Sequence, residues 1–172
     1  MIKMAGCILI IFSCWGMGHI AALKLKMRVK ELRCFKVSLQ MLETEVSYSN
    51  TPLPSALYAV ASKSDGPARS IFGQTSLLLK ERQFSTVGDA FEKALNDNAS
   101  KLSFSKEDME ILRSFGYMLG CSDTLNQVKN FNLVIKQLEA QETKAEESRG
   151  KNERMYNNLG FLSGLAITVL LL

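Results

Sequence analysis

The sequence predicts an all-α protein, a six-helix bundle flanked by N- and C-terminal transmembrane helices. Three observations support this fold class. Apolar residues recur three and four positions apart through the middle of the chain, and no segment alternates apolar and polar residues as a strand does. The 172 residues include only three prolines, all before residue 68. The two end segments, Met4–Leu23 and Asn157–Leu172, contain no charged residue.

The apolar ends set the predicted domain boundaries: a transmembrane helix at residues 1–23, a helical bundle at 24–156 and a second transmembrane helix at 157–172. A membrane-spanning helix needs about 20 apolar residues. The first segment is long enough, and the shorter second segment requires slight thinning of the bilayer. The alternative for the first segment is a cleaved signal peptide with Cys7–Cys14 as its apolar core. The basic run that follows favours an uncleaved anchor, because positive charge there resists translocation.

Charges beside the two apolar segments predict which side of the membrane the bundle occupies. Basic residues gather on the inner flank of each segment: Lys24, Lys26, Arg28, Lys30, Arg33 and Lys36 after the first, and Arg149, Lys151 and Arg154 before the second. Positive residues beside membrane spans stay in the cytoplasm. We therefore expect a cytoplasmic bundle with both termini outside. There Cys34 and Cys121 stay reduced, whereas the reversed orientation would permit a disulfide between them.

The first half of the bundle is predicted to contain three helices. The first continues from the N-terminal segment and ends near Tyr48, before a helix-breaking stretch at residues 49–52. Thr51 or Pro54 begins a short second helix that ends near Ser62. A turn at residues 65–67 precedes the third helix, at residues 68–82. The predicted core residues of these helices are Leu32, Phe35, Leu39, Leu42, Val46, Leu57, Val60, Ile71, Phe72, Thr75, Leu78 and Leu79.

The second half is predicted to contain three more helices. Ser85 caps the fourth, and Ser105 opens the fifth with a sequence that resembles a capping box. Gly120 ends the fifth helix. Ser122 caps the sixth, which runs into the second apolar segment through a charged stretch, residues 139–154, that we expect to be solvated. The predicted core residues are Val87, Ala90, Phe91, Ala94, Leu95, Met109, Leu112, Phe115, Leu119, Leu125, Val128, Phe131, Ile135, Leu138 and Ala145.

The sequence lacks the common catalytic and cofactor-binding motifs. The single histidine, His19, lies in the first apolar segment, which excludes His-based catalysis and multi-His metal sites from the bundle. The phosphate-binding, dinucleotide-binding, hydrolase and zinc-protease motifs are absent. No basic stripe interleaved with aromatic residues indicates nucleic-acid binding. We therefore expect a protein that is not an enzyme and needs no cofactor or metal.

Two features of the apolar segments suggest further roles. His19 is the basis of an alternative hypothesis, in which an ionisable group inside the membrane handles protons or a small molecule. Gly160 and Gly164 form a GxxxG motif, which permits close packing of transmembrane helices. The first apolar segment is the natural partner for such packing in the same chain.

Motifs distributed over the whole chain resemble one family. A basic run follows the N-terminal apolar segment, and the pattern Leu39-x-x-Leu42-Glu43-x-Glu45-x-x-Tyr48-x-x-Thr51-Pro52-Leu53 ends the first helix. The pattern Leu119-Gly120-x-Ser122-Asp123-x-x-x-Gln127 opens the last helix, and Leu159-Gly160-Phe161-Leu162-x-Gly164 precedes the apolar end. In this order the motifs resemble the stage III sporulation protein AB family of endospore-forming bacteria. That family is similar to the F-domain of type II secretion and type IV pilus platform proteins, which implies a six-helix bundle.

The resemblance also implies a role. Such a protein sits in the mother-cell membrane facing the forespore, as a non-enzymatic part of the channel apparatus between the two cells. The implied partners are the secretion-type ATPase of the complex (stage III sporulation protein AA), other membrane proteins of the stage III A complex and membrane lipids, and an oligomer is compatible with this role. The alternative is a membrane-anchored receptor or sensor whose bundle faces outside.

The family motifs also supply candidate partner-binding residues. These are Glu43, Glu45, Tyr48, Thr51, Ser122, Asp123 and Gln127. A structural role competes with partner binding at most of these positions. Thr51 and Ser122 are natural helix caps, and Asp123 in a first helical turn suits the helix dipole. Glu45 and Tyr48 can tie the end of the first helix to a neighbouring helix.

Overall fold

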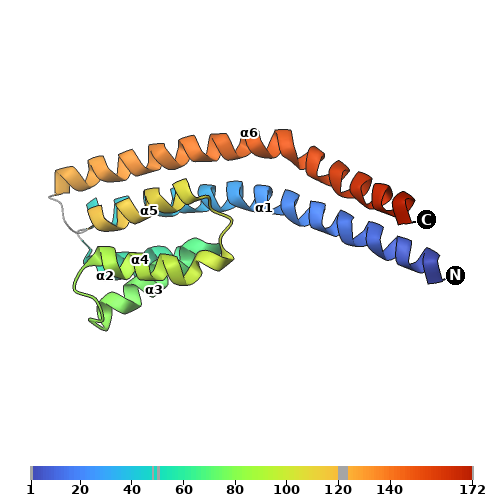
Figure 1. The fold of residues 1–172 in the computed structure, drawn as a ribbon. Helices are drawn as coiled ribbons and strands as arrows, with labels where there is room; N and C mark the ends of the chain where they lie inside the picture. Colours follow the sequence, from blue (N-terminus) through green and yellow to red (C-terminus); the bar gives the residue numbers. More distant parts are fainter. Residues whose placement is uncertain (1, 48, 50, 120–123, 172) are drawn as a thin grey trace. The chain divides into compact units, whose positions relative to one another are not determined.

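The computed structural model describes the backbone of residues 2–47, 49, 51–119 and 124–171, and the side-chain surroundings of residues 19–47, 49, 51–119, 126–152 and 155. These residues form helices and no strand (Figure 1): α1 (Ile2–Ser47), α2 (Leu53–Lys63), α3 (Gly66–Lys80), α4 (Val87–Asn98), the 3-10 helix η1 (Ala99–Lys101), α5 (Lys106–Met118) and α6 (Thr124–Leu171). The predicted all-α class with six α-helices is confirmed for the described residues. The short η1 was not predicted.

The chain divides into two compact units. One consists of Met1–Val29 and Thr143–Leu172, and the other is Lys30–Glu142. The predicted bundle at residues 24–156 extends beyond the second unit at both ends. Among the residues that the structure describes, no helix is both long enough and apolar enough to cross a membrane. The transmembrane helices at 1–23 and 157–172 stay predictions.

The two terminal helices are the longest elements of the fold. α1 has 46 residues and α6 has 48, so each contributes to both compact units. The prediction that the first and last helices of the bundle continue into the apolar ends is therefore confirmed for the backbone. The predicted stop at Gly120 and cap at Ser122 lie outside the described residues.

Five phenylalanines connect five helices of the Lys30–Glu142 unit. Phe35 of α1 lies 5.6 Å from Phe72 of α3 between ring centroids, and Phe72 lies 6.1 Å from Phe91 of α4. Phe91 lies 6.0 Å from Phe115 of α5, which lies 5.3 Å from Phe131 of α6. Tilted and edge-to-face ring pairs at these distances add to the energy of burial. All five side chains are at most 1% exposed, as the helical spacing of the sequence predicted.

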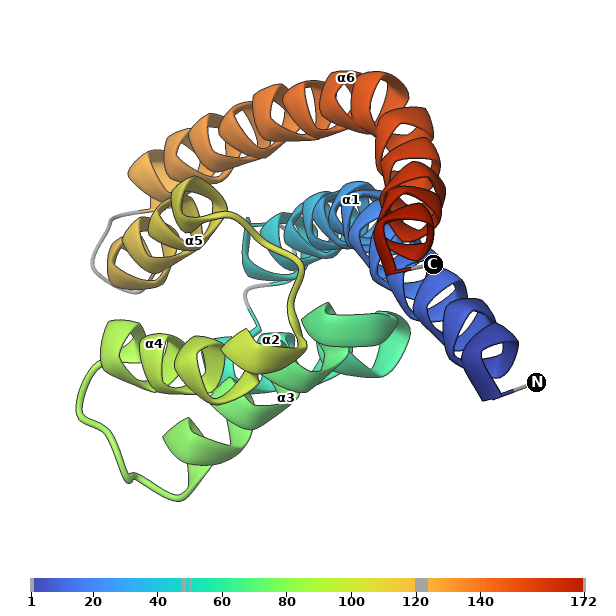
Figure 2. The same ribbon diagram turned by 45° about the vertical axis from the view of Figure 1, so that its right-hand side comes forward.

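The shorter helices complete this unit. α2 packs against α3, α3 against α4, and α4 against α5 (Figure 2). The contact between α4 and α5 depends on Gly116, where an added Cβ would lie 2.7 Å from the Phe91 ring. Glycine is required at that position because two helices approach each other there.

Three local predictions are corrected or refined by the structure. Thr86 rather than Ser85 caps α4, because its Oγ1 accepts a hydrogen bond from the Asp89 backbone N–H at 3.1 Å. The expected turn at residues 65–67 is already the start of α3, with Asp65 as N-cap and the following Gly66 at a φ of 58°. The capping box of α5 is confirmed, since Ser105 and Asp108 exchange both of its hydrogen bonds.

Most predicted core residues are buried. The exceptions with described side chains are half-buried: Val46, Leu79, Val87, Met109, Val128 and Ile135. Val134 is fully buried in α6, although the sequence pattern favoured its neighbour Ile135. A helical stripe predicts a face of the helix, and packing then selects between adjacent residues at its edge.

Candidate functional site

Three of the candidate partner-binding residues hold the end of α1 to its neighbours. Glu45 Oε1 forms an ion pair with Lys63 Nζ of α2 at 3.2 Å, and its backbone carbonyl accepts a hydrogen bond from the Thr51 N–H at 3.4 Å. Glu43 Oε1 accepts a hydrogen bond from Asn132 Nδ2 of α6 at 3.4 Å. All three residues are half-buried. Their described contacts are internal to the bundle. The expected tie of Glu45 to a neighbouring helix is confirmed, whereas the expected cap at Thr51 is wrong, because Pro52 is the N-cap of α2 and no side chain caps that helix.

The remaining candidates make no described contact of this kind. Gln127 is half-buried in α6, and its side chain has no hydrogen bond to another described residue. Tyr48, Ser122 and Asp123 lie outside the described residues. Gly160 and Gly164 lie in α6, where the structure describes the backbone. Partner binding by these positions stays a prediction.

Glu142 lies at the centre of a polar cluster that the sequence did not predict. Its carboxylate is 8% exposed and accepts a hydrogen bond from Arg33 Nε at 2.8 Å and one from Lys36 Nζ at 2.7 Å. Burial by itself would raise the pKa of Glu142, but the two cations of α1 outweigh it and hold that pKa below its usual range. The expectation that residues 139–154 are fully solvated is therefore wrong at this position.

The sequence did carry a weak signal for this cluster. Glu142 follows Leu138 by four residues and so continues the apolar stripe of α6. Arg33 and Lys36 lie three residues apart on one face of α1 and can reach the same carboxylate. Pairing them required knowledge that α1 and α6 are neighbours, which spacing within one helix does not supply.

A second buried carboxylate, Glu31, lies on α1 at 3% exposure. Its Oε2 accepts a hydrogen bond from the Ser103 backbone N–H at 2.8 Å, in the segment between η1 and α5. Burial raises the pKa of Glu31, against the opposing effect of the bonds from Ser103. Gln141 of α6 donates to Glu107 of α5 at 3.1 Å. These polar contacts fix α5 and its preceding loop between the two long helices of the unit.

Among the described residues, no group of three or more His, Cys, Asp or Glu side chains is placed to hold a metal ion. Cys34 is a half-buried free thiol whose Sγ–H donates to the Asp65 carbonyl at 3.0 Å. His19 has an exposed side chain in the other compact unit.

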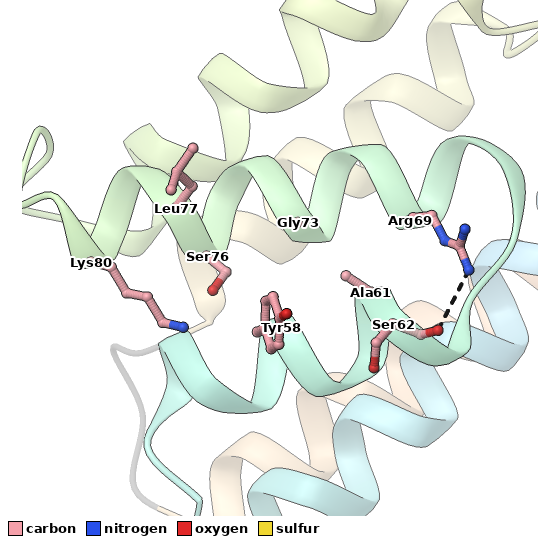
Figure 3. A pocket seen from close by; sticks show the side chains of 8 residues that line it. All are labelled: Tyr58, Ala61, Ser62, Arg69, Gly73, Ser76, Leu77 and Lys80. Atoms are coloured by element: carbon pink, nitrogen blue, oxygen red, sulfur yellow. Dashed lines mark hydrogen bonds between the residues drawn. The ribbon is translucent and has the colours of Figure 1, made fainter.

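A groove of about 420 Å³ lies between α2 and α3 and is here called the α2–α3 groove (Figure 3). Its lining comes from these two helices: Tyr58, Ala61, Ser62, Arg69, Gly73, Ser76, Leu77 and Lys80. The α3 residues recur at helical spacing and so form one stripe along that helix. Ala61 and Ser76 are buried, whereas Tyr58 and Leu77 are 61% and 55% exposed. The groove therefore exposes apolar surface.

Hydrogen bonds shape both ends of the α2–α3 groove. At one end, the Arg69 guanidinium donates to the Ser64 carbonyl at 3.0 Å. It also donates to the Ser62 carbonyl at 3.5 Å (Figure 3). These carbonyls lie at the C-terminal end of α2, where a cation suits the helix dipole. At the other end, Lys80 Nζ lies 4.6 Å above the centroid of the Tyr58 ring. The sequence did not predict this groove, because its lining residues form no motif.

Comparison with known proteins gives one consistent result. The sequence profile of a family described as stage III sporulation protein AB matches residues 3–172. The stage III sporulation protein AB of Bacillus subtilis (strain 168) is 33% identical over 172 residues, covering 100% of both chains. A solved structure of a stage III sporulation protein AB is similar with a TM-score of 0.68 and 32% identity, over 73% of this chain and 98% of that chain.

Proposed function

This chain belongs to the stage III sporulation protein AB family, and from that premise we propose that it links a cytoplasmic secretion-type ATPase to the membrane components of the sporulation channel. A role in sporulation follows from the family. The proposal adds that the protein is a two-pass membrane protein of the mother cell, that its bundle is cytoplasmic, and that it acts by binding rather than by catalysis. Its partners are stage III sporulation protein AA and other membrane proteins of the stage III A complex.

The observation that carries the proposal is the ion-pair cluster of Glu142. It ties α6 to Arg33 and Lys36 of α1 inside the bundle. These are also the two helices that continue into the apolar ends of the chain. A buried carboxylate that is bonded to two cations has few alternative geometries, because breaking either bond leaves buried charge unpaired. Force on the bundle is therefore carried by both helices together.

The side-chain chemistry of the bundle fits a binding role. The buried carboxylates of Glu31 and Glu142 accept hydrogen bonds from their neighbours and are used in packing. The exposed apolar surface of the α2–α3 groove is the type of feature through which soluble domains bind other proteins.

The proposed orientation is tested with a cysteine on the bundle surface. Lys101 is exposed on η1, so Lys101→Cys in a chain whose other cysteines are serine gives one accessible thiol. A membrane-impermeant maleimide should label it only after permeabilisation of the cells. Labelling in intact cells would favour the receptor alternative, in which the bundle faces outside.

The adaptor role is tested by binding and by sporulation. The full chain in detergent should bind purified stage III sporulation protein AA saturably in biolayer interferometry, and should not bind an unrelated P-loop ATPase. Glu142→Gln should keep this binding but lower spore formation, because it loosens the connection between α1 and α6 and leaves the surface unchanged. Glu147→Gln, at an exposed position of the same helix, is the matched control. Absence of ATPase binding by the wild-type chain would overturn the proposal.

A further inference from the structure

The α2–α3 groove presents two cations and no carboxylate. Arg69 and Lys80 lie eleven residues apart on α3, which is about 16 Å along the helix axis. Both are exposed, and neither forms an ion pair with any described carboxylate. The nearby Lys63 differs, since Glu45 neutralises it at 3.2 Å. The groove therefore carries, at its two ends, positive charge that no described carboxylate neutralises.

The lining between the two cations includes exposed apolar side chains. Tyr58 and Leu77 are more than half exposed, although apolar side chains of this size are usually buried. The Lys80 ammonium above the Tyr58 ring restricts that ring by a cation–π contact. An exposed tyrosine whose position is already restricted loses little entropy on binding, and tyrosine and arginine are over-represented among the residues that dominate interface energy.

The floor of the groove is open because of Gly73. This residue lies in the middle of α3, where glycine makes a helix less stable than alanine does. An added Cβ would lie 3.7 Å from Ala61 Cβ, which is an ordinary contact. Packing of α2 on α3 therefore does not require glycine here. The effect of Gly73 is to leave space between the walls of the groove.

From these features we propose that the α2–α3 groove binds an acidic segment of the partner ATPase. The segment places an apolar side chain over Gly73 and carboxylates against Arg69 and Lys80. A basic segment would be repelled by both cations, and a purely apolar one would desolvate them without supplying a partner. This inference deepens the proposed function and rests on it, because the ATPase is the partner named there.

The test uses one groove variant and a control that matches it in residue type, spacing and exposure. Leu77→Ser with Lys80→Glu removes an exposed leucine and reverses a charge three residues further along α3. Leu133→Ser with Lys136→Glu makes the same changes at the same spacing on α6, where Leu133 is 50% exposed. The affinity of the full chain in detergent for purified ATPase is measured for the wild type and both variants. Far-UV circular dichroism and thermal melting check that each variant is folded.

A third variant tests the space in the groove without changing charge. Gly73→Met extends a flexible side chain from the groove floor, and Gly73→Ala adds only the Cβ that the structure accommodates. Methionine should weaken ATPase binding and alanine should not. Both substitutions favour the helix, so a loss of binding by the methionine variant alone cannot be ascribed to unfolding of α3.

The expected result is a loss of affinity of about tenfold or more for the Leu77→Ser, Lys80→Glu variant, and less than about twofold for its control. Wild-type affinity should also fall as salt is raised. Equal binding by the wild type and the groove variants would overturn the groove proposal and leave the adaptor role intact. A loss in the α6 control instead would assign docking to another face. No binding by the wild type would overturn both proposals.

The alternative occupant of the α2–α3 groove is a second copy of this chain, and a further measurement distinguishes it from the ATPase. Sedimentation velocity of the wild type and the groove variant gives the mass of each. If the groove variant changes oligomeric mass but keeps its affinity for the ATPase, the groove binds another copy and the proposal is wrong.

Discussion

Removal of the Glu142 charge should destabilise the bundle by an amount that depends on pH. Glu142→Gln keeps the shape of the side chain, but its amide nitrogen cannot accept from Lys36 or Arg33. One buried hydrogen bond to a charged group is lost, which is worth about 1.5–3 kcal/mol. Loss of the bond to Lys36 should cost more free energy than loss of the bond to Arg33. The Lys36 side chain is only 20% exposed, whereas that of Arg33 is 57% exposed and partly solvated. The expected loss at neutral pH is about 2–3 kcal/mol.

Urea unfolding of the full chain in a mild detergent, followed by far-UV circular dichroism, measures this loss. With a slope of about 2 kcal/mol per molar urea, the midpoint should fall by about 1–1.5 M. The folded-state pKa of Glu142 lies below the ordinary value of 4.5, so its contribution is present above that value and is lost as pH falls through the depressed pKa. The difference between wild type and variant should therefore shrink in acid.

The control for this experiment is Glu147→Gln, which changes an exposed carboxylate of the same helix. It should alter stability by less than about 0.5 kcal/mol. The reasoning is refuted if the Glu142 and Glu147 variants unfold at the same urea concentration at neutral pH. It is also refuted if the deficit of the Glu142 variant stays constant when the carboxylate of the wild type is protonated.

Further substitutions test three other parts of the fold by the same unfolding measurement. Gly116→Ala should cost about 1–3 kcal/mol, because the new Cβ would lie 2.7 Å from the Phe91 ring. Thr86→Ala should cost about 1 kcal/mol through loss of the α4 cap, whereas Ser85→Ala should change stability by less than about 0.5 kcal/mol. Because burial raises the pKa of Glu31, the wild type should lose stability as pH rises through that pKa, and Glu31→Gln should lack this loss.

Each of these expectations has a clear contrary outcome. Gly73→Ala is the control for Gly116→Ala, since its Cβ meets only an ordinary contact at 3.7 Å, and equal destabilisation by both would contradict the packing argument. A larger loss of unfolding free energy for Ser85→Ala than for Thr86→Ala would show that Ser85 caps α4. If the difference in unfolding free energy between the wild type and Glu31→Gln does not change with pH, then this carboxylate does not titrate at a raised pKa.

Much of the fold was predictable from short-range pattern. The aromatic residues of the core, Phe35 to Phe131, occupy positions in stripes that recur every three or four residues, and such stripes mark the buried face of a helix whatever it packs against. The capping box at Ser105 was predictable for the same reason, because a capping residue and its partner lie within one helical turn. The α4 cap shows the limit of such prediction. Ser85 was predicted and Thr86 is the cap, because two adjacent hydroxyl residues are equivalent capping candidates in the sequence.

The candidate site was predictable only in part. Thr51 does lie beside Glu45 just after the end of α1, whereas Glu43 contacts a different helix, although the family motif that contains all three is a local one. Their structural contacts with Lys63 and Asn132 come from α2 and α6. Side chains that form contacts inside the bundle are not available to bind a partner, and only the structure identifies those contacts.

The sequence by itself determined the helices, most of the buried face of each and the apolar, charge-free ends of the chain. These properties depend on residues within one or two helical turns. Only the tertiary structure decided that Glu142 is buried, because its partners are Arg33 and Lys36, 109 and 106 residues away in the chain. It also decided that Tyr58 and Leu77 stay exposed in the α2–α3 groove, because none of the described helices covers that groove. Burial of a charge and exposure of an apolar surface both depend on neighbours from other helices, and local sequence pattern does not specify those neighbours.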